Sequence, residues 1–379
     1  MKNLKKLGFG FMRLPLTDAD DVRSIDRGQL EKMVDYFIEH SFTYFDTAYM
    51  YHDYTSEEAL RGALVERHPR DSFTVATKLP LMLLEKEGDQ ERIFEEQLKK
   101  CGVEYFDYYL LHNVNTNSMD KVEKFDSFGF VKKLKEEGRV RHIGFSFHDG
   151  AEMLDRLLAE HSEMEFVQLQ VNYLDWDNEG IQSRKCLETA RRHGKPVVVM
   201  EPVKGGSLVE IPDEAKAMFK ECAPDMSPAS WAVRFAAGQE GVALVLSGMS
   251  SFEQLADNVS YMEDFKPLTE GELEVLERAK AVIAAAKAIP CTACRYCVDG
   301  CPVEIPIPEY FALYNAHKQT KKGIFDIQTL YYKNMTKRRA KASDCLGCGQ
   351  CERACPQHIK VMEGLKEVAA AFEPKEEEK

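Results

Sequence analysis

Residues 73–112 read FTVATKLPLMLLEKEGDQERIFEEQLKKCGVEYFDYYLLH, and this stretch contains the repeating unit of the fold. Phe73–Lys78 and Tyr105–His112 are predicted strands, and Gln90–Cys101 between them has the spacing of an amphipathic helix. Apolar strand sequences of this kind are typical of a parallel sheet that is buried on both faces. The stretch therefore predicts a strand–helix–strand unit of an α/β protein.

The same alternation of strand and helix extends from residue 1 to about residue 285. Further amphipathic helices are predicted at Gln29–His40, Ser56–Arg67 and Ile181–His193. The other predicted strands are short and β-rich: Leu7–Phe11, Tyr44–Thr47, His142–Phe147, Phe166–Val171, Pro196–Glu201 and Ala243–Ser247. Eight strands, each followed by a helix, predict a (β/α)8 TIM barrel over residues 1–285.

Two near-identical cysteine runs follow in the last quarter of the chain. One consists of Cys291, Cys294, Cys297 and Cys301 before Pro302, and the other of Cys345, Cys348, Cys351 and Cys355 before Pro356. Thiolates at this spacing, with a proline after the fourth, are typical of [4Fe–4S] ligation. In two-cluster ferredoxins the fourth cysteine of each run ligates the other cluster, so Cys355 would complete the first site and Cys301 the second.

Disulfides and zinc sites are the alternative interpretations of these cysteines. Disulfides are not expected in a chain that shows no export signal, because they form mainly in oxidising compartments. A zinc site requires only four ligands, and zinc binding would not explain the proline that follows each run. We therefore predict two [4Fe–4S] clusters.

The segment around the cysteines differs from a compact bacterial ferredoxin. A separation of 43 residues lies between the two runs, and Pro308–Thr320 and Asp326–Lys341 have helical patterns. Residues 272–288, rich in Ala and Glu, also have helical spacing and lead into the first run. We predict a small α-helical ferredoxin-like domain at residues 286–364 and a charged tail at 365–379, of which Glu373–Lys379 is expected to be disordered.

Composition and charge exclude several functional classes. The formal net charge of −13 argues against non-specific binding of nucleic acid. No apolar run approaches the length that a membrane-spanning helix needs. The basic N-terminal residues are not followed by a continuous apolar stretch, so they do not predict a signal peptide. We expect a cytoplasmic protein.

Four titratable side chains lie at the ends of three consecutive predicted strands. Asp46 and Tyr51 follow the second strand, Lys78 ends the third and His112 ends the fourth. Catalytic residues of barrel enzymes lie at the C-terminal ends of strands. A buried lysine is costly unless it is paired, and Asp46 is its candidate partner. Taken singly, Asp46 could be a helix cap, Tyr51 a rim aromatic and His112 a core histidine. Together with Lys78 they favour an active site.

These residues resemble the aldo-keto reductase family, and the similarity covers nearly all of residues 1–285. The residues that carry it are Gly8-Phe9-Gly10-Phe11-Met12-Arg13, Asp46-Thr47-Ala48, Tyr51, Ser56-Glu57, Lys78, His112, Ile143-Gly144-Phe145-Ser146, Gln168 and Asn172. With the cysteine runs, the chain resembles the aldo-keto reductases that carry a C-terminal dicluster ferredoxin domain. The resemblance implies an NAD(P)H-dependent oxidoreductase that interconverts a small carbonyl compound and an alcohol.

The resemblance also implies a division of roles among the four residues. A hydride added to a carbonyl carbon leaves negative charge on the oxygen, so a proton donor must lie beside it. We expect Tyr51 to be this general acid/base, and Lys78, held by Asp46, to lower its pKa. His112 would donate a hydrogen bond to the substrate oxygen and orient it.

The expected nicotinamide-binding residues depart in part from the family pattern. By resemblance, Ser146 and Gln168 hold the carboxamide. Phe147 replaces the asparagine that usually follows the serine, and Met200 takes the place of the aromatic ring that commonly stacks on the nicotinamide.

The phosphate-binding residues are expected after the last two strands, where barrels often bind phosphate. Two turns follow these strands, Gly205-Gly206-Ser207 and Ser247-Gly248-Met249-Ser250, with ordinary tight turns as the alternative interpretation. Further on, relatives specific for NADP place an arginine four residues before Asn258, where this chain has Gln254. This difference favours NADH, although Lys204 could compensate for the missing charge.

The role of the clusters stays open at this level. A hydride carries two electrons and a cluster passes one, and no flavin fingerprint is present, so the clusters could be structural, a redox gate or an electron wire. An electron-transfer protein and a non-catalytic redox sensor are the alternatives, although a sensor would not need Tyr51 and Lys78 together. Oxygen-labile clusters favour an anaerobic metabolism.

A basic stretch before the second run could dock a ferredoxin or a flavodoxin, or form a solvated helix face: Lys333, Lys337, Arg338, Arg339 and Lys341.

Overall fold

The chain forms two compact units in the computed structural model. The structure describes residues 4–177, 181–286, 288–319, 329, 332–333, 335–337 and 339–373. One unit comprises Met1–Val203 with Met226–Glu270, and the other comprises Lys204–Asp225 with Gly271–Lys379. These units differ from the predicted division at residue 285, because a segment that follows the seventh strand belongs with the cysteines.

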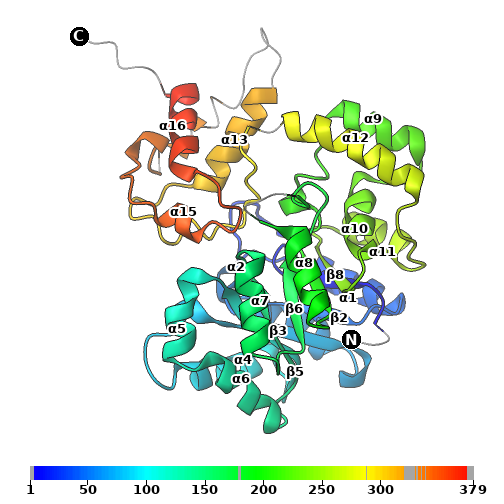
Figure 1. The fold of residues 1–379 in the computed structure, drawn as a ribbon, viewed down its shortest axis with the longest axis vertical. Coiled ribbons are helices and arrows are strands. Elements are labelled where there is room, and N and C mark those ends of the chain that lie inside the picture. Colours follow the sequence, from blue (N-terminus) through cyan, green and yellow to red (C-terminus); the bar gives the residue numbers. More distant parts are fainter. Residues whose placement is uncertain are drawn as a thin grey trace. The chain divides into compact units, whose positions relative to one another are not determined.

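The first unit is a closed barrel of eight parallel strands that pair in chain order (Figure 1). The strands are β1 Leu7–Gly10, β2 Tyr44–Asp46, β3 Thr74–Pro80, β4 Phe106–Val114, β5 Val140–Phe147, β6 Phe166–Gln170, β7 Val197–Met200 and β8 Val242–Gly248. All eight predicted strands are confirmed, with small shifts at their ends. The predicted TIM barrel is therefore confirmed as well.

Helices follow the strands on the outside of the barrel (Figure 1). They are α1 Arg27–Glu39, α2 Tyr51–Tyr54, α3 Ser56–Leu60, α4 Asp89–Cys101, α5 Met119–Lys124, α6 Ser127–Glu136, α7 Ala151–Glu160, α8 Ser183–Arg192, α10 Pro228–Gly238 and α11 Phe252–Met262. Capping residues fix the first residues of some of these helices. Asp26 caps α1 and Ser251 caps α11, each by accepting a hydrogen bond from a backbone N–H of the first turn. The predicted helix at Ser56–Arg67 divides into α3 and a π-helical turn at Arg61–Val65.

Side chains fill the interior of the barrel, and polar groups gather at its C-terminal end. Successive residues of a strand point to opposite faces. Tyr44, Tyr108 and Phe166 form part of an interior cluster that is separate from the core under the helices. The same alternation continues to buried polar residues at the strand ends, namely Asp46, Lys78, His112, Ser146 and Gln168. The barrel thus has an apolar floor and a polar upper layer.

Gly144 on β5 makes room for this interior packing. It pairs with Phe166 on β6. A methyl group at position 144 would lie 2.5 Å from the Phe166 carbonyl oxygen and 2.8 Å from its ring. Only glycine therefore allows the Phe166 ring to fill this layer.

The second unit is helical, as predicted. Its helices are α9 Asp213–Cys222, α12 Glu270–Ala286, α13 Ile307–Gln319, α15 Gln350–Ala354 and α16 Val361–Phe372. Its core joins residues of α13 and α16 with several cysteines, and Phe311 packs directly on Gly364. Among the described residues, no helix is both long enough and apolar enough to span a bilayer.

The end of this unit differs from the predicted boundary at residue 364. Helix α16 continues to Phe372, and Leu365, Val368 and Phe372 are buried in the core. Their i, i+3, i+7 spacing is that of a helix with one apolar face. Most of the predicted helix at Asp326–Lys341 and the tail from residue 374 onward lie outside the described residues.

Candidate functional site

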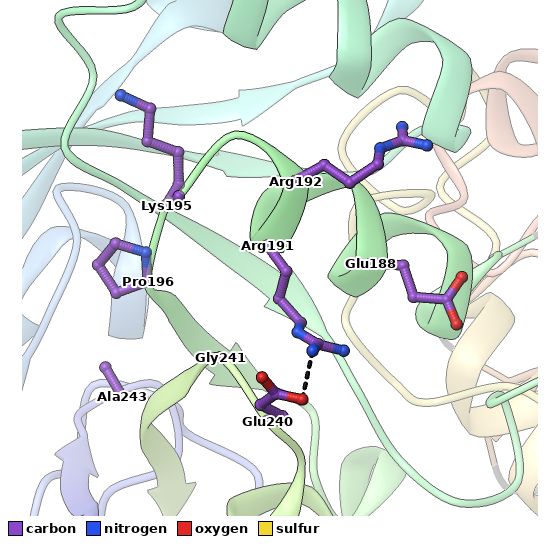
Figure 2. Close-up of a pocket in the computed structure, with 9 residues that line it drawn as sticks. Glu188, Arg191, Arg192, Lys195, Pro196, Glu240, Gly241 and Ala243 are labelled. Carbon is purple, nitrogen blue, oxygen red and sulfur yellow. Dashed lines mark ion pairs between the residues drawn. The ribbon is translucent and has the colours of Figure 1, made fainter.

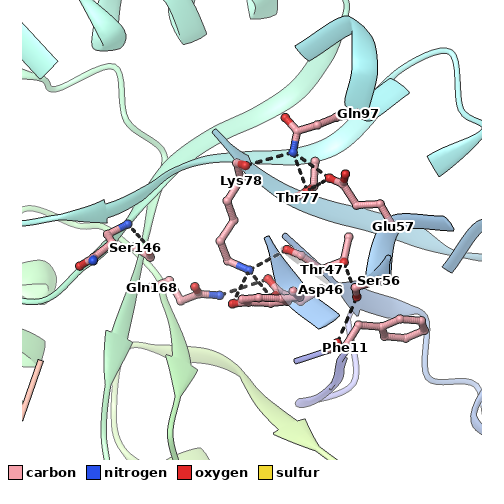
Figure 3. Close-up of polar contacts among 12 residues, drawn as sticks. Phe11, Asp46, Thr47, Ser56, Glu57, Thr77, Lys78, Gln97, Ser146 and Gln168 are labelled. Carbon is pink, nitrogen blue, oxygen red and sulfur yellow. Dashed lines mark hydrogen bonds and ion pairs between the residues drawn. The ribbon is translucent and has the colours of Figure 1, made fainter. Parts of the chain in front are cut away.

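A buried ion pair occupies the polar end of the barrel. The Lys78 Nζ atom lies 2.5 Å from Asp46 Oδ1 and also donates to the Thr47 carbonyl oxygen at 2.8 Å (Figure 3). Gln168 Nε2 donates to the other carboxylate oxygen of Asp46 at 3.2 Å. Both charged side chains are almost wholly buried. Such a pair is stable only when further hydrogen bonds satisfy both ions, and this site provides them.

The other two predicted catalytic residues lie beside this pair. Lys78 Nζ is 3.4 Å from the Tyr51 hydroxyl oxygen and 4.9 Å from the centre of its ring. The rings of Tyr51 and His112 meet edge to face, with their centres 5.9 Å apart. The structure therefore brings Asp46, Tyr51, Lys78 and His112 together at the C-terminal ends of β2, β3 and β4.

The turn that carries Tyr51 has an uncommon backbone conformation. His52 and the two residues after it have left-handed φ values of 51°, 48° and 68°, which is costly for residues other than glycine. The His52 ring holds this turn: Leu14 N–H donates to Nε2 at 3.0 Å, and Nδ1 lies 2.7 Å from the Val22 carbonyl oxygen. Because Nε2 accepts, Nδ1 carries the proton and donates. His52 thus positions the tyrosine turn.

Burial dominates the electrostatics of the pair. It raises the pKa of Asp46 and lowers the pKa of Lys78, because each charged form loses its hydration. The short contact between them acts in the opposite direction on both groups. Each ion therefore depends on the other to remain charged.

The pKa of Tyr51 moves in the direction opposite to our expectation. Loss of hydration raises it well above its ordinary value, and the negative charges of Asp46 and Glu201 raise it further, while Arg13 lowers it. The Lys78 ammonium lies closer to Asp46 than to the Tyr51 hydroxyl, so the carboxylate offsets its effect on the phenol. The net shift of this pKa is therefore upward, and the effect of Lys78 on the phenolate stays a prediction.

The His112 imidazole is held neutral. Burial lowers its pKa well below the ordinary value, and the positive charges of Lys78 and His148 lower it further. A neutral imidazole carries one N–H and can donate a single directed hydrogen bond. This state suits a residue that orients a carbonyl oxygen.

A second buried network, behind Lys78, has no counterpart in the sequence analysis. Glu57 Oε1 accepts from Thr77 Oγ1 and from Gln97 Nε2, each at 2.8 Å (Figure 3). Gln97 Nε2 also lies 3.0 Å from the Lys78 carbonyl oxygen, and Tyr109 donates to Gln97 Oε1 at 2.7 Å. Burial raises the pKa of Glu57 to about 7. The network ties the end of β3 to α3 and α4.

One sequence signal could have revealed this network. The buried face of α4 is formed by Ile93, Phe94, Gln97 and Cys101, so Gln97 is an amide at an apolar-stripe position. A buried amide needs partners, and its position on the stripe directs it towards the sheet.

The expected nicotinamide residues lie at the same end of the barrel. Ser146 on β5 and Gln168 on β6 are paired in the sheet register and are both buried. Ser146 Oγ accepts from Asn113 N–H at 2.8 Å. A serine hydroxyl and a glutamine amide can each donate and accept, as a carboxamide does, so these residues fit that group. Met200 ends β7 and is half-buried.

The residues after β8 form the start of α11. Gln254 Oε1 accepts from Ser250 N–H at 2.8 Å, and Asn258 Nδ2 donates to the Gln254 carbonyl oxygen at 2.8 Å. Ser250 Oγ donates to the Arg13 carbonyl oxygen at 3.1 Å, and Gly248 lies against the Arg13 side chain. The Gln254 amide is thus already engaged with the backbone of its own loop.

The turn after β7 belongs to the second unit, with the cysteines. Lys204 is buried, and its Nζ donates to Gln357 Oε1 at 2.9 Å. Gly205 lies against the backbone of Thr292. Gly206 and Ser207 complete the turn, and Ser207 Oγ donates to the Lys204 carbonyl oxygen.

The two cysteine runs have the same backbone conformation. In the first run, Ala293 and Arg295 have left-handed φ values of 56° and 68°. The corresponding residues of the second run are Gly347 and Gly349, with φ values of 68° and 70°. Alanine and arginine adopt this conformation at a cost. The repeated turns show that both runs wrap in the same way.

The runs also meet across the sequence. Burial raises the pKa of Cys291 to about 11, and the charge of Cys355 raises it further. Burial likewise raises the pKa of Cys297, with further contributions from Cys294, Cys291 and Cys355. The fourth cysteine of the second run therefore lies near Cys291 and Cys297 of the first run, as crossed ligation requires.

The chemistry of this donor set fits iron–sulfur clusters. None of the eleven cysteines, all of which lie in the described part, is joined in a disulfide. Nor do three His, Cys, Asp or Glu side chains among the described residues converge closely enough for a single metal ion. The thiolates of a [4Fe–4S] site bind separate irons, and coordination deprotonates thiols whose pKa is raised.

A pocket of about 1020 Å³ lies elsewhere, before β7 and β8, at the end of the barrel opposite the polar layer (Figure 2). Its basic groups are engaged within the protein: Arg191 pairs with Glu240, and Lys195 Nζ donates to the Ser162 carbonyl oxygen. This end of a barrel serves stability rather than catalysis.

Comparison with known proteins agrees with both parts of this description. Residues 6–281 match the model of the aldo/keto reductase family, and residues 290–359 match that of a 4Fe-4S dicluster domain. A probable aldo-keto reductase of Glycine max is 32% identical over 157 residues, which are 38% of this chain and 41% of that relative. The uncharacterized oxidoreductase YqkF of Bacillus subtilis is 24% identical over 308 residues, 73% of this chain and 92% of that protein.

The solved structures show the same fold. An aldo/keto reductase from Klebsiella pneumoniae, in complex with NADP and acetate, matches with a TM-score of 0.57 and 22% identity over 73% of this chain and 91% of that one. At this identity the likeness concerns the fold alone. Because the family model spans most of the sequence, the protein belongs to the aldo/keto reductase family, and a 4Fe-4S dicluster domain follows its barrel.

Proposed function

We propose that the protein is an NAD(P)H-dependent oxidoreductase that interconverts a small carbonyl compound and an alcohol. One observation carries this proposal: Tyr51, His112 and the Lys78–Asp46 pair meet at the catalytic end of the barrel. A phenol and a neutral imidazole side by side can both donate hydrogen bonds to one carbonyl oxygen.

In this proposal the chain's own residues handle the proton. Tyr51 donates its phenolic proton to the substrate oxygen in reduction and takes a proton from the alcohol in oxidation. His112 donates a hydrogen bond to the same oxygen and sets its direction. Lys78, fixed by Asp46 and Thr47, holds the hydroxyl of Tyr51 in place and stabilises the phenolate that forms when the proton leaves.

A bound nicotinamide cofactor would supply the hydride. Ser146 and Gln168 are proposed to hold its carboxamide, with Met200 against the ring. Gly248, Ser250, Gln254 and Asn258 are proposed for the phosphate and adenosine end. The neutral Gln254 favours NADH, since a 2′-phosphate would lack a cation at this position, whereas the Klebsiella structure holds NADP.

The second unit is proposed to hold two [4Fe–4S] clusters. Cys291, Cys294, Cys297 and Cys355 would ligate one, and Cys345, Cys348, Cys351 and Cys301 the other. The proximity of Cys355 to the first run supports this crossed arrangement. Three roles of the clusters stay as alternatives: support of the structure, gating of the barrel, and transfer of single electrons.

Partner and location remain predictions. The basic stretch at residues 333–341 could bind a ferredoxin or a flavodoxin, and Arg338 within it lies outside the described residues. A cytoplasmic location is predicted from the sequence pattern, and an anaerobic metabolism from the oxygen lability of the proposed clusters. The assembled tetrad disfavours a non-catalytic redox sensor, because sensing would not require an acid/base group.

Replacing Tyr51 by phenylalanine should abolish most carbonyl reduction. The ring and its packing stay, while the proton donor is lost, so we expect kcat to fall by roughly 10²–10⁴-fold. Steady-state oxidation of NADH or NADPH with a panel of aldehydes measures this. The matched control is Tyr54→Phe, since Tyr54 lies on the same short helix and is exposed. Full activity in Tyr51→Phe would overturn the proposed role.

The raised pKa of Tyr51 predicts opposite pH profiles for the two directions. The phenol stays protonated from about pH 6 to about pH 9, because its pKa lies above the ordinary value of about 10, so kcat for reduction should be flat. Oxidation needs the phenolate, whose fraction rises about tenfold per pH unit below the pKa. Oxidation should therefore increase with pH throughout this range. A plateau of the oxidation rate near neutrality would show instead that the pKa is lowered.

Replacing Cys355 by serine should remove one cluster. The holoprotein is expected to contain about eight iron atoms per chain, and the variant about four, because only one ligand set is broken. Iron and acid-labile sulfide assays on anaerobically purified protein measure this, with the exposed Cys222→Ser as control. Unchanged iron and sulfide in Cys355→Ser would contradict the ligand assignment.

A further inference from the structure

Glu201 is an acidic side chain at the catalytic end of the barrel that the proposed mechanism does not use. It directly follows Met200, the last residue of β7, and its side chain is only 13% exposed. Its φ value of 56° lies in the left-handed region, where a glutamate is strained. Backbone strain of this kind is concentrated at functional sites, so Glu201 is a candidate for a role in the reaction.

A buried amide holds this strained backbone in place. Nδ2 of Asn172, which is wholly buried, donates to the Glu201 carbonyl oxygen at 3.2 Å and to Asp175 Oδ2 at 2.8 Å. The side-chain oxygen of Asn172 accepts from the backbone N–H of Asp175 at 2.9 Å. The loop after β6 therefore fixes the backbone from which the Glu201 side chain extends.

The carboxylate of Glu201 is only partly satisfied. Arg13 Nη1 donates to its Oε1 atom at 3.4 Å, which is long for a contact between two charged groups. The Oε2 atom is buried, and no donor among the described residues reaches it. Asp46, by contrast, has an ammonium at 2.5 Å and an amide donor on its other oxygen. The negative charge of Glu201 is therefore less completely offset than that of Asp46.

The field of this carboxylate reaches the reacting groups. Burial has the largest effect on the pKa of Tyr51, and the charge of Glu201 raises that pKa further. Arg13 acts in the opposite direction with a smaller effect, so the pair acts on the Tyr51 hydroxyl as a net negative charge. The substrate oxygen must lie at this hydroxyl, and the hydride donor must lie beside the carbonyl carbon. A nicotinamide ring bound for reaction is therefore subject to the same field.

The charge of the nicotinamide changes during the proposed reaction. In reduction, a hydride leaves C4 of the neutral dihydronicotinamide with both bonding electrons and forms the new C–H bond at the carbonyl carbon. The Tyr51 proton goes to the oxygen, so the carbonyl is reduced to the alcohol while the ring is oxidised to a cation. A carboxylate near the ring stabilises the cation and has little effect on the neutral form.

We propose that Glu201 stabilises the oxidised, cationic nicotinamide and so makes the bound cofactor a stronger hydride donor. This inference rests on the proposed function and adds a direction to it, since such a site favours reduction of the carbonyl over oxidation of the alcohol. Arg13 limits the effect by offsetting part of the carboxylate charge. The adjacent Met200, proposed to lie against the ring, places Glu201 at the same part of the site.

The test is an equilibrium measurement on the anaerobic full-length holoprotein at about pH 8 without substrate. Isothermal titration calorimetry gives the Kd values of NAD+, NADH, NADP+ and NADPH. The two forms of one nucleotide share their phosphates and adenosine, so the ratio of the oxidised to the reduced Kd isolates the charge of the ring. In Glu201→Gln this ratio should rise about fivefold or more, because the cation loses its counter-charge. The absorbance of the reduced nucleotide is read before and after each titration to show that it stays reduced.

Two further variants make the result specific. Arg13→Gln should lower the same ratio, because the full charge of the Glu201 carboxylate then acts on the ring. Glu58→Gln is the matched control, because Glu58 is exposed on α3 and solvent screens its charge. Its ratio should equal that of the wild type.

The proposal is overturned if Glu201→Gln binds both forms of a nucleotide with the wild-type ratio, or if Glu58→Gln shifts the ratio as far as Glu201→Gln does. Should Glu201→Gln fail to fold, Arg13→Gln decides: a lower ratio supports the proposal, and an unchanged or higher ratio overturns it. A wild-type protein that binds none of the four nucleotides would refute the proposed function itself, and this inference with it. The ratios are read without turnover, so they do not depend on whether Tyr51 is the proton donor.

Discussion

The Asp46–Lys78 ion pair is the interaction on which the catalytic end of the barrel depends. Two charges inside a closed barrel lose most of their hydration, and removing one partner of such a pair typically costs about 3–5 kcal/mol. The 2.5 Å contact is held by Thr47 and Gln168 on either side and by the Glu57 network behind Lys78. Lys78 in turn lies within 3.4 Å of the Tyr51 hydroxyl. The pair thus joins the strand ends, the proposed proton donor and a proposed nicotinamide-binding residue in one polar layer over an apolar floor.

The chain passes from the barrel unit to the unit with the cysteines shortly after β7. Met200 at its end belongs to the barrel, while Lys204, four residues later, belongs to the unit that carries the cysteines. In a barrel that binds a dinucleotide, the loops after the last strands commonly hold phosphate. Here the turn after β7 contacts Thr292 and Gln357, which belong to the unit with the cysteines. The turns after β7 and β8 both stay predicted phosphate-binding sites.

Much of the fold could be predicted because its signals are local. Buried parallel strands are short apolar runs, the cysteine runs have a distinctive spacing, and strand ends of a barrel converge whatever the intervening helices contain. The contacts that the sequence did not reveal depend on residues far apart in the chain. Gln357 accepts a hydrogen bond from Lys204, Leu14 and Val22 fix His52, and the closeness of Asp46 offsets the effect of Lys78 on Tyr51. These effects depend on distances between atoms, and the order of residues along the chain does not give those distances. Helix α16 was missed for another reason: its apolar face at Leu365, Val368 and Phe372 runs directly into a charged end.

The central proposal is that the barrel reduces its substrate by a two-electron hydride transfer from a bound nicotinamide. The most direct measurement is a single anaerobic turnover with nicotinamide cofactor deuterated at the transferable C4 position, in ordinary water, followed by mass spectrometry of the alcohol. Our account predicts one deuterium on the carbinol carbon of each product molecule. Hydrogen from water on that carbon, with oxidation of the clusters during the turnover, would contradict it.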